Sequence, residues 1–373
     1  MKPALVLDCG SGAIKAGLSN AEMPTNIIPS VCGRHRSITG DDNQNQNDAI
    51  YYGNLALQKR GLISLRYPIE HGIVCNWDDM EKLLHHTFFN ELRIDPKDED
   101  VFLSEASLNP KANREKSVEI LFEKFDINSV AMASQSILGL YSSGRTSGMV
   151  CESGEGVTHC IPIYEGYSLP QAIVRSDIGG RDVTDYLIKL LAEKGHKFYT
   201  TAERQIAKNM KEMICYVSRN YVKSEIAKIE NDNENHYLYE LPDGNNIELN
   251  CERLAPEIMF QPQLMGREQQ FGLTQLINES VMKSEMDLRR TMWRNIVLSG
   301  GNTMFEGLRI RLNNELSRIT PKSVDVKVDA MSNRKYCVWI GSAVLANLCR
   351  NNWMQKQQFE EFGAARITVL TSY

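Results

Sequence analysis

The hydrophobic pattern of the chain begins with a short apolar run, a glycine turn and an alternating segment. Residues 4–7 (ALVL) are apolar and lead directly to Asp8, and the turn 9–12 (CGSG) follows. Residues 13–18 (AIKAGL) then alternate in the manner of a β-strand. The pattern predicts a β-hairpin with a carboxylate and flexible glycine backbone at its tip.

The same design returns in the middle of the chain. Residues 148–151 (GMVC) precede Glu152, the turn 153–156 (SGEG) and a second strand-like segment over 157–163. The two acids, Asp8 and Glu152, lie 144 residues apart. We therefore expect an α/β protein with two similar halves that face each other across a cleft.

Other segments show helical spacing of apolar residues or a polar composition typical of loops. We expect helices over 78–92, with Asp78 as the N-cap, over 183–193 and over 201–222. A strand is expected over 296–298, followed by a helix from Glu306. The segments 40–48 (GDDNQNQND) and 230–236 (ENDNENH) are expected to be exposed loops.

The paired turns suggest a chemistry for the cleft. Glycine-rich turns bring backbone N–H groups close to an anion, and Ser11 and Lys15 would add donors for the β- and γ-phosphates of a nucleotide. Glu152 and Glu155 would repel a phosphate unless a divalent cation intervened; Asp8 and Glu152 could hold the waters of Mg²⁺. Taken alone, a glycine-rich hairpin tip is more often structural, and a metal site is a further alternative. The pair favours a nucleotide site.

Three further features are open to a functional and a structural interpretation. The turn 299–302 (SGGN) lies between a strand and a helix, where backbone amides favour anions or ribose oxygens. The segment 176–182 (SDIGGRD) could let a ribose or base pack against backbone. His159, in the second hairpin, could orient an attacking water. The alternatives are a tight strand-to-helix turn at 299–302 and a structural role for His159.

Composition narrows the class of protein. The chain has 373 residues, 42% of them hydrophobic and 24% charged, and a net charge of -5, which argues against a general nucleic-acid binder. Its nine cysteines form no CxxC pair, which indicates reduced thiols in a cytosolic or nuclear setting. No apolar run reaches roughly 18 residues and no secretory signal precedes the first strand, so no membrane association is expected.

Long blocks of the sequence resemble actin, in order and over essentially the whole length. They are 67–93, 109–116 (NPKANREK), 140–148 (LYSSGRTSG), 156–170 (GVTHCIPIYEGYSLP), 180–187 (GRDVTDYL), 211–217 (KEMICYV), 239–244 (YELPDG), 297–307 (VLSGGNTMFEG) and 334–348 (RKYCVWIGSAVLANL). The chain is thus identified, by resemblance, as a divergent actin or actin-like protein.

The resemblance implies a two-lobed fold of duplicated α/β domains around a nucleotide cleft. Residues 1–142 and 337–373 would form the first lobe, with 31–67 as its outer subdomain. Residues 143–336 would form the second lobe, with 179–265 as its outer subdomain.

The resemblance also implies ATP or ADP and Mg²⁺ or Ca²⁺ as ligands. Asp8, Gln135 and Glu152 would surround the cation through water, and Gln135 and His159 would position the water that attacks the γ-phosphate, with Glu152 as the third residue of the catalytic set. The nucleotide would be bound by Ser11, Gly12, Lys15, Gly154, Glu155, Gly156, Val157, Gly180, Lys211, Glu212, Gly301, Met304, Phe305 and Lys335.

The sequence departs from actin inside the expected site. Actins have Asp at the positions of Glu152 and Glu155, and a Glu carboxylate lies one methylene further out. A displacement of about 1 Å can cost roughly a hundredfold in a step that depends on positioning, whereas a hydrated cation tolerates it. We therefore expect ATP–Mg²⁺ binding to be retained and hydrolysis to be slow or impaired.

Expected contact surfaces depart as well. The loop 37–48 (SITGDDNQNQND) is polar where actins carry small and apolar residues. The loop 263–271 (QLMGREQQF) is more charged than the apolar plug that actins use between filament strands. Actin's acidic N-terminal tail is absent, since Lys2 and Pro3 precede the first strand. A groove for amphipathic helices of partners would comprise Tyr141, Gly144, Thr146, Ile340, Val344, Leu345, Leu348 and Met354, with core packing as the alternative, above all for Leu345 and Leu348.

The resulting expectation is an ATP-dependent structural subunit, of filaments by self-association or of a larger motor or cytoskeletal complex, and at most a slow ATPase. A non-polymerising subunit of a dynein-arm or chromatin-type assembly is the alternative. A small-molecule kinase of the same superfamily is more remote, because no sugar-binding segment is evident. The expected location is the cytoplasm and cytoskeleton, with cilium or nucleus as alternatives.

Overall fold

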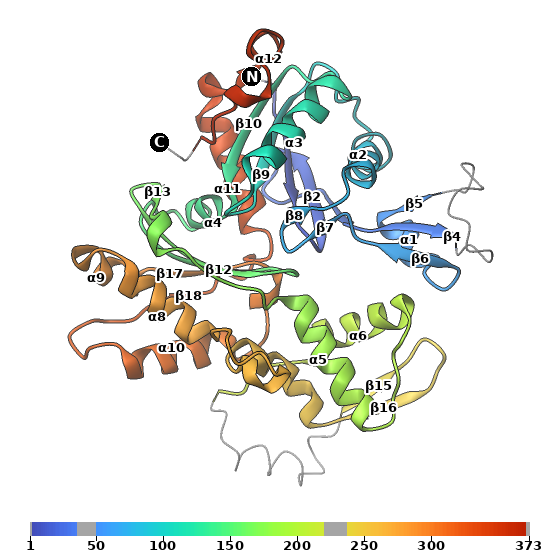
Figure 1. Cartoon of the computed structure of the whole chain (residues 1–373), viewed down its shortest axis with the longest axis vertical. Helices are drawn as coiled ribbons and strands as arrows, with labels where there is room; N and C mark the ends of the chain where they lie inside the picture. Colours follow the sequence, from blue (N-terminus) through green and yellow to red (C-terminus); the bar gives the residue numbers. More distant parts are fainter. Residues whose placement is uncertain (1, 36–49, 220–236, 371–373) are drawn as a thin grey trace.

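Two six-stranded β-sheets organise the computed structural model, which describes residues 2–35, 50–219 and 237–370 (Figure 1). The first sheet consists of β1 (Leu5–Cys9), β2 (Ala13–Leu18), β3 (Asn26–Pro29), β9 (Asp100–Glu105), β10 (Ser129–Ser134) and β19 (Met354–Gln355), in the order β19-β10-β9-β1-β2-β3. The second consists of β11 (Gly148–Ser153), β12 (Thr158–Tyr164), β13 (Tyr167–Ser168), β14 (Val174–Ser176), β17 (Ile296–Ser299) and β18 (Val328–Asp329), in the order β13-β12-β11-β17-β18 with β14 beside β12.

The two sheets repeat one local topology. β1 and β2 form an antiparallel hairpin, as do β11 and β12. Asp8 lies opposite Lys15 in the first hairpin, and Glu152 lies opposite His159 in the second, so each acid faces the residue seven positions later. β1 then pairs in parallel with β9, and β11 with β17. The repeat seen in the sequence is therefore a repeat of strand pairing and register.

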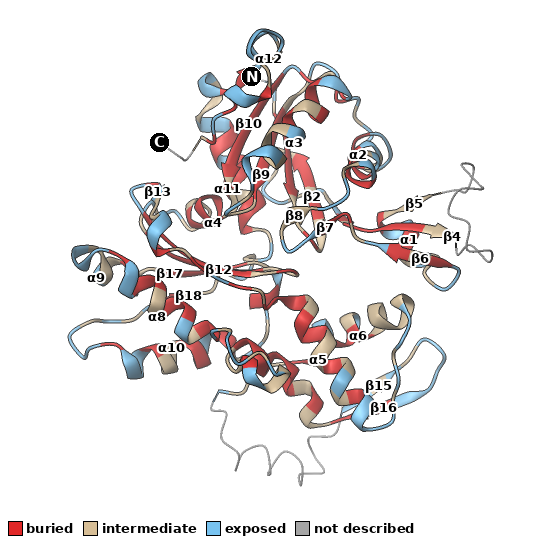
Figure 2. Cartoon of the chain, in the orientation of Figure 1, coloured by how far each residue is buried: buried red, intermediate tan, exposed pale blue. Residues whose placement is uncertain are grey.

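Alternate residues of β1 face two helical layers. Leu5 and Leu7 share a buried cluster with α2 (Trp77–His85), the π-helical segment η1 (His86–Leu92) and α3 (Lys111–Glu123). Val6 faces the opposite side, where α11 (Cys337–Leu348) packs and Trp339 donates its indole N–H to the Val6 carbonyl at 3.1 Å. The sheet is thus buried on both faces, as its parallel centre requires (Figure 2).

The second sheet is covered in the same way. Met149 and Cys151 of β11 face a cluster that includes α5 (Gly180–Glu193), α8 (Leu273–Lys283) and α10 (Leu308–Ile319). Val150 faces the other side, against α4 (Gln135–Tyr141). α4 contacts β9 and β10 of the first sheet and β11 and β17 of the second, and it packs on α11, so it joins the two sheets (Figure 1).

Smaller elements complete the described fold. They are the sheet of β4 (Cys32–His35), β5 (Tyr51–Tyr52) and β6 (Ile63–Arg66) with α1 (Gly53–Gln58), the hairpins β7 (Ile69–Glu70) with β8 (Ile73–Val74) and β15 (Tyr237–Glu240) with β16 (Asn246–Leu249), the helices α6 (Thr201–Ile214), α9 (Met286–Arg294) and α12 (Lys356–Phe362), and the 3₁₀ segments Pro170–Ala172, Cys251–Met259, Pro262–Met265, Gly301–Thr303, Arg350–Asn352 and Ala364–Arg366. Over the described part of the chain, every helix is too short or too polar to cross a membrane.

Most expected elements are present, with differences at their ends. Asn76, not Asp78, caps α2, because its side chain accepts the N–H of Asp79 at 3.0 Å. α6 ends at Ile214 instead of continuing to residue 219, and α10 begins at Leu308 instead of at residue 306. Three expected segments lie outside the described residues: the loop 37–48, the end of the helix at 220–222 and the loop 230–236. The lobe and subdomain limits expected from the sequence stay a prediction.

Candidate functional site

A cavity of about 720 Å³ lies between the two hairpins, at the carboxyl ends of β1 and β11. Ligand sites of α/β proteins are found outside the carboxyl ends of their parallel strands. The residues that the sequence assigned to phosphate, adenosine, cation and water line this cavity: Asp8, Ser11, Gly12, Lys15, Gln135, Glu152, Gly154, Glu155, Gly156, Val157, His159, Lys211, Glu212, Gly301, Met304, Phe305 and Lys335. Gly180 lies directly behind them, since a Cβ there would be 2.8 Å from Glu155 Oε2 and 3.2 Å from Lys211 Nζ.

Asp8 at the end of β1 is held by three donors. Its Oδ1 accepts from Ser104 Oγ at 2.6 Å and from Gln135 Nε2 at 3.0 Å, and its Oδ2 accepts from Lys15 Nζ at 2.6 Å. Lys15 points back to Asp8 because the two residues face each other across the hairpin. The first hairpin therefore presents a fixed carboxylate–ammonium pair to the cavity.

Glu152 at the end of β11 has a different environment. Its Oε2 accepts a hydrogen bond from Ser136 Oγ at 3.2 Å. Burial, and after it the negative charge of Asp8, raises the pKa of Glu152 to about 7. The carboxyl groups of Asp8 and Glu152 thus lie close together in the cavity, and the ammonium group of Lys15 lies near both.

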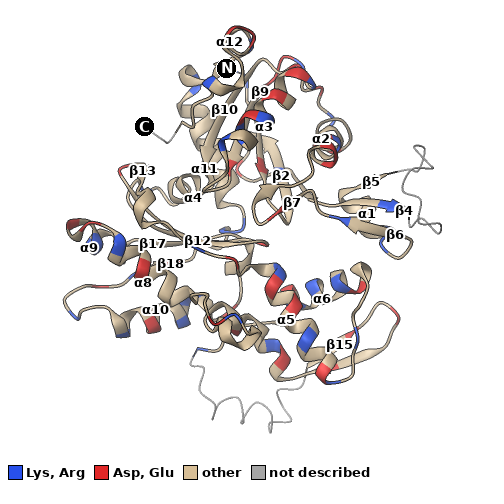
Figure 3. Ribbon diagram, viewed as in Figure 1, with Lys and Arg blue, Asp and Glu red and all other residues tan. Residues whose placement is uncertain are grey.

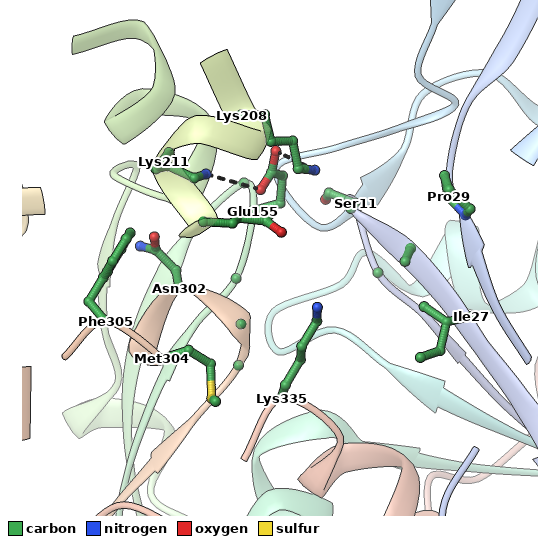
Figure 4. Close-up of a pocket in the computed structure, with 18 of the residues that line it drawn as sticks. Ser11, Ile27, Pro29, Glu155, Lys208, Lys211, Asn302, Met304, Phe305 and Lys335 are labelled. Carbon is green, nitrogen blue, oxygen red and sulfur yellow. Dashed lines mark ion pairs between the residues drawn. The ribbon is translucent and has the colours of Figure 1, made fainter. Parts of the chain in front are cut away.

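Glu155 at the tip of the second hairpin binds two lysines of α6 (Figure 4). Its Oε1 lies 3.0 Å from Lys208 Nζ, and its Oε2 lies 3.8 Å from Lys211 Nζ. Burial opposes ionisation of the carboxyl group, but the charges of Lys211 and Lys208 outweigh it and lower the pKa of Glu155 to about 2. In Figure 4 Glu155 lies between these lysines and Ser11 of the first hairpin, so it helps to close the gap between the two walls.

Two buried polar atoms in the wall lack a partner among the described residues. They are Nε2 of His159 and Oδ1 of Asn302, and both residues line the cavity. Burial, and then the charge of Arg175, lowers the pKa of His159 to about 4, so its ring is neutral near pH 7. A buried polar atom without a partner is costly, and a bound molecule would satisfy both.

The turn between β7 and β8 closes the site from the side. Gly72 N–H donates to Ser11 Oγ at 2.9 Å, and His71 Nδ1 lies 2.9 Å from the Gly156 carbonyl oxygen, to which it donates. A Cβ on Gly156 would be 2.9 Å from His71 Cα, so any larger residue at position 156 would push this turn away. One turn thereby touches both glycine hairpins.

These features fit a nucleotide bound together with a cation. The glycine turns line the cavity with backbone, and Lys15 and Lys335 supply positive charge near it. His159 Nε2 and Asn302 Oδ1 have no hydrogen-bond partner among the described residues. Asp8 and Glu152 supply two carboxylates, and no third His, Cys, Asp or Glu completes a metal-binding group among the residues that the structure describes. This set matches a cation held largely through water and phosphate, as Mg²⁺ is in nucleotide sites.

Comparison with known families identifies the class of protein. A family model described as "Actin" matches residues 1–371. The chain belongs to the actin family. The resemblance seen in the sequence is confirmed, and so is the α/β fold of actin type. Proteins of the actin family typically bind a nucleotide and a divalent cation.

The surface expected to bind partner helices has exposed and buried members. Those at least partly exposed are Tyr141, Gly144, Thr146, Ile340, Val344 and Leu348. Leu348 has 75% of its surface exposed. Leu345 is instead buried in the cluster of Trp339, so for this residue the alternative expectation of core packing is correct. Met354 is also buried, in the cluster of Leu5. Neither buried side chain is available at the surface, and partner binding by the others stays a prediction.

Sequence reasoning missed several residues that complete the site. Lys208 lies three positions before Lys211 on α6, and this helical spacing places both on one face. Asn302 lies in a turn that the sequence singled out, but its role depends on its contact with Ser153 Oγ at 2.9 Å. No local signal marks His71, because its contact with Gly156 depends on a tertiary approach.

Proposed function

We propose that this actin-family chain binds ATP or ADP together with Mg²⁺ or Ca²⁺ between its two sheets. The observation that carries the proposal is the matched pair of hairpins, Asp8 opposite Lys15 and Glu152 opposite His159, which face one cavity. Two glycine turns on opposite sides of one cavity can donate backbone N–H groups to one chain of phosphates.

The lining residues suggest how the nucleotide would be held. The turns 9–12 and 153–157, with Ser11, would hold the phosphates, and Lys15 would supply positive charge. Adenosine would lie against the remaining wall, where Figure 4 labels Lys211, Met304, Phe305 and Lys335. Glu212 and Gly301 also line the cavity. A bound cation would offset the charges of the phosphates and of the two carboxylates on the floor of the cavity.

We infer that hydrolysis is slow, so that the protein is at most a weak ATPase. Gln135 directs its amide N–H group to Asp8 and Ser104, and Glu152 directs one oxygen to Ser136. The amide N–H group of Gln135, which was expected to position the attacking water, and one oxygen of Glu152, from the same catalytic set, are thus already bonded within the chain. His159, by contrast, is neutral near pH 7, and its Nε2 has no hydrogen-bond partner among the residues that the structure describes.

We further propose that the chain acts as a structural subunit, in filaments or in a larger motor or cytoskeletal complex of the cytoplasm, cilium or nucleus. The loop around 263–271 favours restricted polymerisation. Arg267 bonds the Asp177 carbonyl at 2.7 Å and the Asp182 carboxylate at 2.6 Å, and Gln270 Oε1 accepts from Ser176 Oγ at 3.1 Å. These bonds fasten the loop to the chain's own turn instead of leaving it free to insert between subunits.

The nucleotide proposal is tested by equilibrium binding. Titration of the purified chain with ATP and Mg²⁺ should give saturable binding at micromolar concentrations that weakens when the cation is chelated. Absence of binding under both conditions would overturn the proposal.

Activity and assembly need separate measurements. Phosphate release should be slower than that of a conventional actin under identical conditions, and equal rates would contradict slow hydrolysis. Transfer of phosphate to a small molecule instead of water would indicate a kinase. Pelleting with Mg²⁺ and salt tests assembly, and robust filaments at low micromolar concentration would exclude the non-polymerising alternative.

A further inference from the structure

A chain of serine hydroxyls leads from Glu152 to the segment between β9 and α3. Ser136 Oγ donates to Glu152 Oε2 at 3.2 Å, and Ser107 Oγ lies 2.6 Å from Ser136 Oγ. Ser134 Oγ lies 3.4 Å from Ser107 Oγ and extends the chain by one weak contact. Ser136 itself is completely buried.

The direction of these bonds follows from the chemistry of the groups. An ionised carboxylate can only accept, and each hydroxyl has one proton to donate. Ser136 therefore uses its proton on Glu152 and must accept the proton of Ser107. A buried hydroxyl that receives one bond and gives another has a fixed orientation, and a hydrogen bond to a charged group is stronger than one between neutral groups.

The three residues come from three separate elements. Glu152 lies on β11 of the second sheet, Ser136 lies in the first turn of α4, and Ser107 lies between β9 of the first sheet and α3. Serine in the first turn of a helix commonly bonds to nearby backbone. Here the hydroxyl of Ser136 instead reaches across to the carboxylate of another sheet, which indicates a role for that carboxylate.

We propose that Ser136, supported by Ser107, is a positioning residue that fixes the carboxylate of Glu152 for a bound divalent cation. It holds Oε2, so that Oε1 is the oxygen that remains available to a cation-bound water. Removing the hydroxyl frees the long Glu side chain to change rotamer. The inference rests on the proposed nucleotide and cation site and assigns to it a residue that does not line the cavity.

The role of Ser136 is specific to the length of Glu152. An Asp at position 152 would be about one methylene shorter and would not reach Ser136. The loss of the hydroxyl should therefore matter with Glu at position 152 and matter little with Asp there. Loss of the Ser136 hydroxyl should also weaken the binding of Mg²⁺ more than that of Ca²⁺, because Mg²⁺ demands nearly ideal octahedral geometry and Ca²⁺ tolerates irregular ligands.

The experiment measures release of a fluorescent adenine nucleotide against free Mg²⁺ and, separately, free Ca²⁺, which gives an apparent dissociation constant for each cation. We expect Ser136→Ala to raise the constant for Mg²⁺ roughly tenfold, as for one charge-assisted hydrogen bond, and Ser107→Ala roughly threefold. In a Glu152→Asp background, Ser136→Ala should change it less than about twofold. Ser142→Ala is the matched control, since Ser142 caps the end of α4 and its hydroxyl donates to the Gly139 carbonyl three residues earlier.

The outcomes separate this inference from the proposed function. If the unmodified chain binds nucleotide in a cation-dependent way but Ser136→Ala has the same effect in both backgrounds, the positioning role is wrong. Equal weakening of Mg²⁺ and Ca²⁺ would likewise indicate a general structural defect and overturn it. If the unmodified chain shows no cation-dependent binding, the proposed function fails and this inference fails with it.

Discussion

The carboxylate of Glu155 lies between two lysines that are one helical turn apart on α6. Lys211 is 3% exposed, and its ammonium group also donates to the Gly180 carbonyl at 2.7 Å. Glu155, which departs from the Asp of actins, therefore forms ion pairs with two lysines. Its tolerance to change depends on how well Lys211 can stay buried without a nearby negative charge.

Replacing Glu155 with Gln keeps the shape and removes the charge. We expect the free energy of unfolding to fall by about 1–3 kcal/mol, because the buried ammonium group of Lys211 loses the negative charge that lies 3.8 Å from it. Urea unfolding followed by circular dichroism measures this. Glu268→Gln is the control, because Glu268 is exposed and should change stability by less than about 0.5 kcal/mol. Equal changes in the two variants would contradict the assignment.

His159 makes stability depend on pH. Its pKa is lowered from 6.5 to about 4 in the folded chain, so the unfolded chain takes up the proton first as pH falls. The stability is complete above about pH 6.5 and is lost progressively towards pH 4, by about 1.4 kcal/mol at about pH 5.5 from this residue alone. Urea unfolding at several pH values should show a shallower loss for His159→Gln. An unchanged slope would show that His159 does not carry this effect.

At the scale of elements, the turn after β17 presses against the second hairpin. Gly300 has a φ of 92°, and a Cβ there would lie 2.3 Å from the Ser153 carbonyl oxygen. Gly244 has a similar φ of 83° but open space around it. Substitution of either glycine would strain the backbone, but only substitution of Gly300 would also cause a steric clash, so comparing the two variants distinguishes the two effects.

We expect Gly300→Ala to destabilise the chain by roughly 1–3 kcal/mol more than Gly244→Ala, because only the former forces two elements apart. Denaturant unfolding of both variants gives the difference. Nucleotide binding should weaken in Gly300→Ala and stay unchanged in Gly244→Ala. Similar behaviour of the two variants would mean that the backbone at Gly300 relaxes without disturbing the hairpin.

Periodicity predicted the elements well where local pattern and tertiary contacts agree. The strands on either side of both glycine turns are within one or two residues of the expectation. The end of α6 was not predictable, because Val217 continues the apolar pattern while its N–H bonds the Glu306 carbonyl at 2.9 Å. That contact also holds Glu306 outside α10, and Gly307, with a φ of 82°, begins the turn into it. Helix ends set by such pairings leave no local signal.

The whole molecule depends on what joins its two sheets. α4 contacts both sheets. Figure 3 shows acidic and basic residues interspersed along α5 and α6. The sequence could predict both hairpins, since each is local. It could not predict that Lys208, His71 and Ser136 complete the site, because their roles depend on distances between elements.

A ligand that contacts both walls should stabilise the whole chain. At a concentration about a hundred times its dissociation constant, it adds about 2.7 kcal/mol to the free energy of unfolding. We expect the midpoint of thermal unfolding to rise by several degrees with ATP and Mg²⁺ and to fall again when a chelator is added. Inorganic phosphate with Mg²⁺ is the control, because it lacks the base and ribose. Equal midpoints with and without ATP would contradict a ligand that bridges the two walls.

The seven-residue offset shared by the two hairpins gives the cleft a direction. The two halves are alike in backbone and register, yet Asp8 faces a lysine and Glu152 faces a histidine that is neutral near pH 7. One wall is thus locally zwitterionic, and the other is locally anionic when Glu152 is ionised. A triphosphate tail is nearly symmetric in shape, but the two walls on either side of it would differ in charge although their backbones are alike. A ligand bound in this cleft would therefore meet two walls that differ in charge at one cross-strand position, and that difference would favour one orientation of the ligand over the other.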